Sequence, residues 1–242
     1  MISELIVTWQ NPITHSWVPV GQLQYKNNKY YFKYTIGAKK ESNFIPFGQM
    51  NNLDDSYESE ELFPLFKNRL LPKSRPEYND YLNWLNLDED TIDPLEELAR
   101  TTGIKATDSL QLFMIPEKTN EMYNVTFFSH GIRHLTPHYI ERVGHLSYGN
   151  KLYLMKDIQN KFDPYALVLR TDDPAEIVGY CPRFFVCDFG ELIKKNGADK
   201  VDVSVIKVNL NSPLQFRLLC QFSTAWPADF VPFKDEAFQT IV

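Results

Sequence analysis

The sequence is poor in cysteine, with only Cys181, Cys187 and Cys220 among its 242 residues. Three cysteines cannot form a disulfide framework, and the five residues between Cys181 and Cys187 differ from the tight spacing of structural zinc sites. We therefore expect buried free thiols in a reducing compartment. No apolar run approaches the roughly 18 residues of a membrane span. The N-terminus also lacks the basic and apolar segments of a secretory signal, so we expect a cytoplasmic protein without membrane association.

Several catalytic signatures are also missing. The sequence contains no GxxxxGK[ST] phosphate loop, no GxGxxG fingerprint, no HExxH pair and no GxSxG elbow. His130, His134 and His138 recur every four residues, but Gly131 and Pro137 would interrupt a helix that carried them. Zinc usually takes three or four protein ligands, and no second cluster is visible. We therefore expect no enzyme, no metal and no cofactor.

Excess positive charge is absent as well. The net charge of −6 excludes a uniformly basic nucleic-acid binder but not a locally basic face. Residues 1–117 contain 11 Lys and Arg against 17 Asp and Glu, whereas residues 118–226 contain 13 against 11. This asymmetry indicates two units with different partners. With a turn at 116–120, we predict domains at 1–117 and 118–226, followed by a tail at 227–242.

The first half mixes strand and helix patterns. Strands are expected at 5–9, 17–25, 29–36 and 110–115, and helices at 61–71, 76–85 and 93–100. Asn27 and Asn28 favour a hairpin turn because Asn tolerates positive φ. Alternation in the third strand places Tyr30, Phe32 and Tyr34 on one face, which we expect to pack against the helices. The acidic segment from Asp54 to Glu61 is expected to be a polar linker.

The second half is richer in strands. We expect strands at 124–128, 151–156, 165–170, 176–180, 200–209 and 214–222, and a helix at 182–195. Asn196-Gly197 is typical of a helix C-terminus. Six strands with one helix predict a small barrel or sandwich. The sequence leaves open whether Trp226 and the tail fold back onto this unit or join an interface.

Polar and aromatic residues gather at three expected strand ends, 128–134, 159–164 and 178–183. Each segment has a cation, an aromatic ring or an amide beside Gly or Pro. Sites for single-stranded nucleic acid combine aromatic rings that stack on bases with cations that contact phosphates. The same residues are also common turn material, so the pattern alone does not decide between a site and ordinary loops.

The segments FFSHGIRHL, GNKLYLMKDIQNKFDPYALVLRTDD and EIVGYCPRFF together resemble the HIRAN domain. The match in order and spacing extends from Val125 to about Phe222, with Asn160-Lys161-Phe162-Asp163-Pro164-Tyr165-Ala166 at its centre. The resemblance implies an OB-like β-barrel with one or two helices. The best understood member of that family binds single-stranded DNA by its free 3′ hydroxyl end.

The resemblance also implies roles for individual residues. Asp163 would accept the proton of the 3′ hydroxyl, Phe162 would stack on the terminal base, and Asn160 would bond the nucleotide or brace the loop. Arg133 and Arg183 would hold phosphates, and Tyr180 would line the pocket. His134 stands at the position where the DNA-binding member has a Tyr, which weakens one stacking platform. Phe162 lacks a phenol hydroxyl, and Lys161 replaces the usual proline. In the alternative interpretation, Asn160 and Asp163 only cap the turn and Phe162 belongs to the core.

The first half is similar to the N-terminal subdomain of HipA-type proteins, through VPVGQLQYKNNKYYFKYTIGA, FIPFGQM, ELFPLFKNRLLP and DPLEELARTTGIKATDSLQLF. HipA-type toxins are kinases, but their catalytic machinery lies C-terminal to this subdomain. The resemblance therefore implies an interaction module.

We predict an α+β protein of bacterial type, in which a HipA-like unit is followed by an OB-like barrel. Its expected function is to bind single-stranded DNA or another nucleic acid while the acidic unit binds a protein partner. The alternative is a toxin–antitoxin-type regulator that binds a HipA-like kinase.

Overall fold

The computed structural model describes residues 3–242 and has a mixed α+β fold built from small antiparallel sheets. The chain forms two compact units. Unit 1 comprises the chain up to Asn79 together with Leu87–Ile115 and Val231–Val242, and unit 2 comprises Asp80–Asn86 and Pro116–Phe230. The functional division into domains at 117 and 226 stays a prediction. Within residues 3–242, every helix is too short or too polar to cross a membrane.

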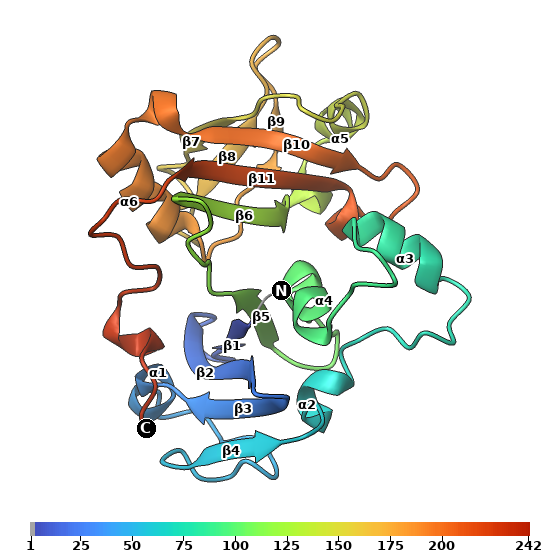
Figure 1. Cartoon of the computed structure of the whole chain (residues 1–242). Helices are drawn as coiled ribbons and strands as arrows, with labels where there is room; N and C mark the ends of the chain where they lie inside the picture. Colours follow the sequence, from blue (N-terminus) through green and yellow to red (C-terminus); the bar gives the residue numbers. More distant parts are fainter. Residues whose placement is uncertain (1–2) are drawn as a thin grey trace. The chain divides into compact units, whose positions relative to one another are not determined.

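Unit 1 is built on a five-stranded sheet in the order β4-β3-β2-β1-β5 (Figure 1). Its strands are β1 (Glu4–Gln10), β2 (Trp17–Lys26), β3 (Lys29–Tyr34), β4 (Ser56–Ser59) and β5 (Leu110–Met114). Asn27 and Asn28 form the two-residue turn between β2 and β3 with φ values of 51° and 62°. Positive φ at both positions matches the right-handed twist of the flanking strands, so the predicted hairpin is confirmed.

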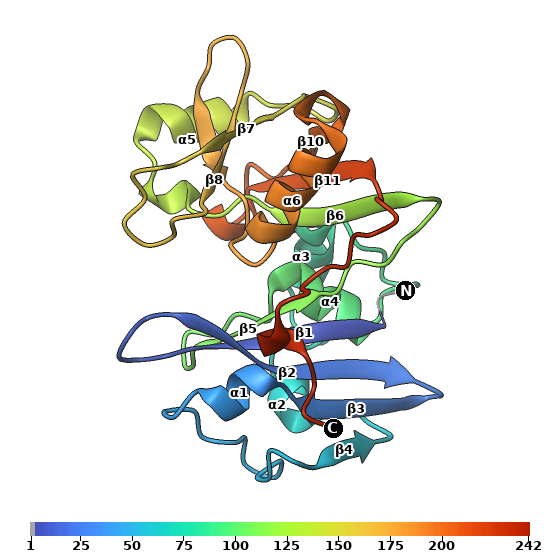
Figure 2. The same cartoon turned by 90° about the vertical axis from the view of Figure 1, so that its left-hand side faces the viewer.

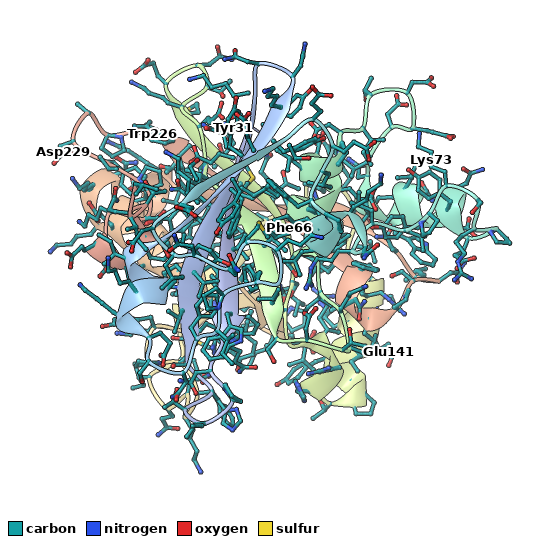
Figure 3. All side chains as sticks on the ribbon, turned by 90° about the horizontal axis from the view of Figure 1, so that it is seen from below. Tyr31, Phe66, Lys73, Glu141, Trp226 and Asp229 are labelled. Carbon is teal, nitrogen blue, oxygen red and sulfur yellow. The ribbon has the colours of Figure 1, made fainter. Side chains whose placement is uncertain are left out.

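The core of unit 1 lies on one face of this sheet. Phe32 and Tyr34 are fully buried, as the alternation in β3 predicts. The Phe32 ring lies 5.7 Å from that of Phe66, which is labelled in Figure 3.

Four helices belong to the first half of the described chain, α1 (Ile36–Lys40), α2 (Pro64–Lys67), α3 (Tyr78–Leu85) and α4 (Pro94–Thr101).

The helix starts were predicted better than the helix lengths. Asp93 caps α4, because its side chain accepts a hydrogen bond from the Glu96 amide at 2.9 Å. The expected helix over 61–71 is wrong in length, since only the four residues of α2 are helical. Pro64 supplies a suitable first residue, and the chain leaves the helix after Asn68 toward Pro72. The expected acidic linker contains the edge strand β4.

Unit 2 contains two three-stranded sheets, in the orders β10-β11-β6 and β7-β8-β9 (Figures 1 and 2). Their strands are β6 (Met122–Phe128), β7 (Tyr153–Lys156), β8 (Leu167–Arg170), β9 (Ile177–Tyr180), β10 (Asp202–Val208) and β11 (Leu218–Ala225). The helices of this half are α5 (Pro137–Gly144) and α6 (Val186–Asn196), with short 3₁₀ turns at η1 (Ile132–His134), η2 (Ala198–Lys200) and η3 (Leu214–Phe216). The segment expected as a strand over 214–222 therefore begins with a 3₁₀ turn.

Two isolated bridges link the sheets of unit 2. His130 pairs with Tyr180 at the end of β9, and Lys151 pairs with Ser204 of β10. Each bridge joins only one pair of residues. In the described chain the two sheets are not connected by continuous strand pairing into a closed barrel. The α+β character of the second half is confirmed at this coarse level, whereas the OB-like barrel is not.

Phe189 lies at the centre of the core of unit 2. Its ring stacks on Phe222 of β11 with centroids 3.9 Å apart and planes 4° apart, and it lies 5.9 Å from Phe127 of β6. Figure 2 shows α6, which carries Phe189, beside β11 and β6. Asp188-Phe189-Gly190 spells the Asp-Phe-Gly of protein kinases, but here the tripeptide lies inside a helix and its ring is buried.

The C-terminal segment divides between the two units. Trp226 packs against Tyr123 and Phe230 in unit 2. Beyond Phe230 the chain belongs to unit 1, where η4 (Glu236–Phe238) precedes a bridge between Thr35 and Thr240. The tail is therefore part of the first unit's fold.

The cysteines differ in their exposure. Cys181 and Cys220 are buried, and burial raises the pKa of both thiols. Cys187 is exposed on α6, so the expectation of three buried thiols is wrong for this residue. It falls on the outward face of a helix whose other face contains Phe189.

Candidate nucleic-acid interface

Two of the three predicted segments meet at the bridge between His130 and Tyr180. Each residue's amide donates to the other's carbonyl oxygen at 2.9 Å. Gly179 makes this close approach possible, because it has a φ of 129° and a Cβ there would lie 1.9 Å from the Ser129 hydroxyl oxygen. Gly131 also lies close to the Tyr180 ring. A Cβ added at Gly131 would stand 3.1 Å from the nearest ring carbon of Tyr180. Backbone pairing therefore fixes Tyr180 beside the 128–134 segment.

Tyr180 also connects to the loop between β7 and β8. Its hydroxyl donates to Asp157 Oδ2 at 3.1 Å, and Asn160 Nδ2 donates to the same oxygen at 3.1 Å. Burial, followed by the hydrogen bond to Asp157 and then its charge, raises the pKa of Tyr180 further above neutral pH. Asp157 was missed by the sequence reasoning because its role depends on a partner 23 residues away.

Asn160 and Asp163 shape the loop by hydrogen bonds to its backbone. Asn160 Oδ1 accepts from the amides of Phe162 and Asp163, both at 3.0 Å. Asp163 Oδ1 accepts from the Tyr165 amide at 2.9 Å. These are the local bonds that Asn and Asp make in turns, so the capping part of the alternative interpretation is present. Asp163 is half-buried as a residue, and no described residue donates a hydrogen bond to its Oδ2.

The other part of the alternative is wrong, because Phe162 does not belong to the core. Its exposed fraction is 89%, and the same hairpin exposes Ile158 at 81%, Tyr165 at 60% and Met155 at 44%. The Lys156 ammonium lies 6.0 Å from the centre of the Tyr165 ring. Large apolar side chains gathered on one loop commonly mark a binding surface. Here they precede and follow Asp163 along the chain.

Two further cations lie on the β7-β8-β9 sheet. The Arg170 guanidinium is 5.1 Å and the Lys151 ammonium 5.6 Å from the centre of the Tyr153 ring. Tyr153 pairs with Arg170, and the next row on the same face contains Met155, Val168 and Tyr180. The two rows are therefore about 7 Å apart. The sequence reasoning missed this group because only the strand register brings its members together.

The predicted cations lie at different places. Arg183 is half-buried, and its charge contributes to lowering the pKa of His130, the residue that pairs with Tyr180. Arg133 and His134 are exposed on η1, where Arg133 Nε donates to His134 Nε2 at 3.0 Å. Within residues 3–242, neither makes a hydrogen bond or ion pair with the 157–166 loop. Hydrogen bonds thus connect Tyr180 through Asp157 to Asn160, and Asn160 to the backbone of Phe162 and Asp163.

His130 predicts a pH dependence of stability. It is half-buried as a residue, and burial together with the Arg183 charge lowers the pKa of its imidazole from 6.5 to about 4. Between about pH 6.5 and pH 4 the His130 imidazole is protonated in the unfolded chain but neutral in the folded chain. The free energy of unfolding should therefore fall as the pH drops toward 4. In urea titrations, His130→Gln should flatten this dependence, whereas exposed His145→Gln should leave it unchanged. An unchanged slope in His130→Gln would contradict the assignment.

Two solved structures are similar to less than half of this chain. Neither the protein-family models nor the curated proteins contain a match to this chain. A crystal structure of a Lactobacillus plantarum protein is similar with a TM-score of 0.34 and 16% identity, covering 43% of this chain and 92% of its own. The crystal structure of the HIRAN domain of human HLTF gives a TM-score of 0.32 and 15% identity, covering 42% of this chain and 74% of its own. Both TM-scores are below 0.5, so these similarities assign neither a fold nor a function.

Proposed function

We propose that unit 2 binds single-stranded nucleic acid and captures the free 3′ hydroxyl end of a DNA strand at Asp163. The observation that carries this proposal is that one braced loop holds both an exposed aromatic ring, Phe162, and a half-buried aspartate, Asp163, whose Oδ2 accepts no hydrogen bond from a described residue. One carboxylate oxygen is occupied by the Tyr165 amide, which leaves the other to accept a hydrogen bond from a ligand.

The charge of Asp163 explains a preference for strand ends. Phosphates within a strand would be repelled by a carboxylate, whereas a terminal hydroxyl donates a charge-assisted hydrogen bond to it. Phe162 stacks on the terminal base, as exposed aromatics do in single-strand sites. Arg183 contacts the adjacent phosphate beside Tyr180. Arg133 and His134 extend the contacts from η1.

The strand then continues along the β7-β8-β9 sheet. Tyr153 lies one row beyond Tyr180, with Arg170 and Lys151 at its ring. The rows are about 7 Å apart along the strands, and β7 and β9 are about 10 Å apart across the sheet because β8 lies between them, so a strand that runs from Tyr180 to Tyr153 covers about 12 Å. An aromatic ring with flanking cations can stack a base and neutralise its phosphate. These cations give a local positive surface in a chain of net charge −6.

Asp163→Asn tests end capture without reshaping the loop, because an amide oxygen can still accept from the Tyr165 amide. The unmodified chain should bind a 3′-hydroxyl oligonucleotide about 10-fold or more tightly than its 3′-phosphate counterpart, since a hydrogen bond to a charged group contributes about 1.5–3 kcal/mol. The variant should lose this preference. Fluorescence anisotropy with both oligonucleotides at two salt concentrations measures it.

Asp172→Asn is the matched control, because Asp172 is an exposed acid in the same unit. It should keep the preference for the 3′ hydroxyl. Equal affinity of the unmodified chain for both ends would reject end capture, and binding without salt dependence would reject phosphate contacts. The kinase-regulator function stays a prediction, as does the protein partner of the acidic unit.

A further inference from the structure

A second candidate site lies on unit 1, on the sheet face opposite its aromatic core. Strand register places Glu4, Gln24 and Tyr31 in one row across β1, β2 and β3. The neighbouring row contains Gln22, Lys33 and Ser56. Such rows have side chains about 5 Å apart across strands and about 7 Å apart along them.

This face is hollowed into an open groove with a volume of about 400 Å³. Lys26, Asn27 and Thr240 complete its lining, the last contributed by the C-terminal segment. The side chains of Gln22, Gln24, Tyr31 and Lys33 make no hydrogen bond to any residue in the described chain, and the same holds for Lys26. At the border of the same face, Lys29 is paired with Glu58 at 3.1 Å. The groove therefore combines unused amides, a ring and two unpaired ammonium groups.

The chemistry of the lining restricts the ligand. An apolar ligand is excluded because the only large apolar surface in the lining is the Tyr31 ring. A divalent cation is disfavoured because two ammonium groups face one carboxylate. The excess positive charge instead favours an anion, and a neutral sugar would leave it unmatched. The ligand should also have a flat polar ring, since Gln24 lies directly opposite Tyr31.

We propose that this groove binds a nucleotide unit, with its base on Tyr31 and its phosphate at Lys33 and Lys26. Glutamine amides form paired hydrogen bonds with base edges, and aromatic rings stack on bases of any sequence. The volume suits one nucleotide. The unit is either a free mononucleotide or one nucleotide within a single strand. This inference does not depend on end capture at Asp163, because it concerns other residues in the other unit.

The test uses the full chain carrying Asp163→Asn and Phe162→Ser, so that the proposed end site cannot account for binding. Calorimetric titrations with AMP and with a short adenine strand separate the two sources of the nucleotide. Tyr31→Ser and Lys33→Gln should each weaken the binding that is seen by about 10-fold, as expected for one lost stacking or charge contact. Lys73→Gln, an exposed lysine of the same unit labelled with Tyr31 in Figure 3, should have no effect.

Each outcome decides the proposal. Binding of AMP that both variants weaken supports a free nucleotide, and binding of the strand alone with the same variant pattern supports a nucleotide within a strand. Binding of neither ligand overturns the proposal. It is also overturned if ribose 5-phosphate binds as tightly as AMP, or if only poly-glutamate binds. Circular dichroism shows whether Tyr31→Ser lowers the stability of the protein. If it does, Lys33→Gln alone decides the test.

Discussion

Gly179→Ala should both destabilise the protein and abolish strand binding. An alanine Cβ would lie 1.9 Å from the Ser129 hydroxyl oxygen and 2.8 Å from the His130 carbonyl oxygen, on a backbone with a φ of 129°. Backbone strain and overpacking each cost about 1–3 kcal/mol, so the free energy of unfolding should fall by about 2–6 kcal/mol. The bridge to His130 would open and release Tyr180 from the loop at Asp157.

Urea denaturation measures the stability change, and anisotropy measures the affinity. Gly190→Ala is the matched control, because Gly190 lies in α6 with open space around the position of its Cβ. Alanine there should stabilise the protein by about 0.5–1 kcal/mol, since glycine weakens a helix interior. If both variants unfold at the same urea concentration, the close approach at Gly179 is not a constraint.

Phe189→Ala should have a comparably large effect on stability. The Phe189 ring is fully buried, stacked on Phe222 and close to Phe127. Truncating a buried phenylalanine costs about 3–5 kcal/mol through lost transfer energy and the cavity that remains. The loss should appear as a lower urea midpoint with an unchanged slope.

Phe162→Ala makes the same chemical change at a ring that is 89% exposed. Its free energy of unfolding should change by no more than about 0.5 kcal/mol, while the affinity for a single strand should fall by about 1–3 kcal/mol. The two variants should therefore separate stability from binding. A large loss of stability in Phe162→Ala, or full strand affinity, would contradict the assigned role of this ring.

Features encoded within a few residues were predictable from the sequence. Asn27 and Asn28 specify their turn by tolerating positive φ, and Asp93 with Pro94 specifies a helix start. The alternation in β3 correctly buries Phe32 and Tyr34. In the candidate site, the run from Asn160 to Asp163 lies in the loop expected between two strands, and the bonds to its backbone are those of the alternative interpretation, whereas its ligand contacts stay a prediction.

Features that depend on distant partners were not predictable. Asp157 belongs to the site because its carboxylate accepts a hydrogen bond from the Tyr180 hydroxyl. Arg170 lies beside Tyr153 because the register of β7 and β8 pairs the two residues. The two bridges that link the sheets of unit 2 join residues separated by 50 or more positions, so local pattern could not show whether the two sheets close into a barrel. The apolar repeat over 61–71 was misleading because loop residues such as Leu62 are buried without being helical.

The order of the segments has a consequence for biosynthesis. Val231–Val242 completes unit 1, where the Ile36 amide donates to the Gln239 carbonyl at 2.8 Å and the Ile241 amide donates to the Tyr34 carbonyl at 3.0 Å. On the ribosome these partners emerge only after all of unit 2 has been translated. Unit 1 therefore cannot form these hydrogen bonds until the C-terminal segment has been translated. All residues of unit 2 are available before then, so unit 2 can reach its native state first.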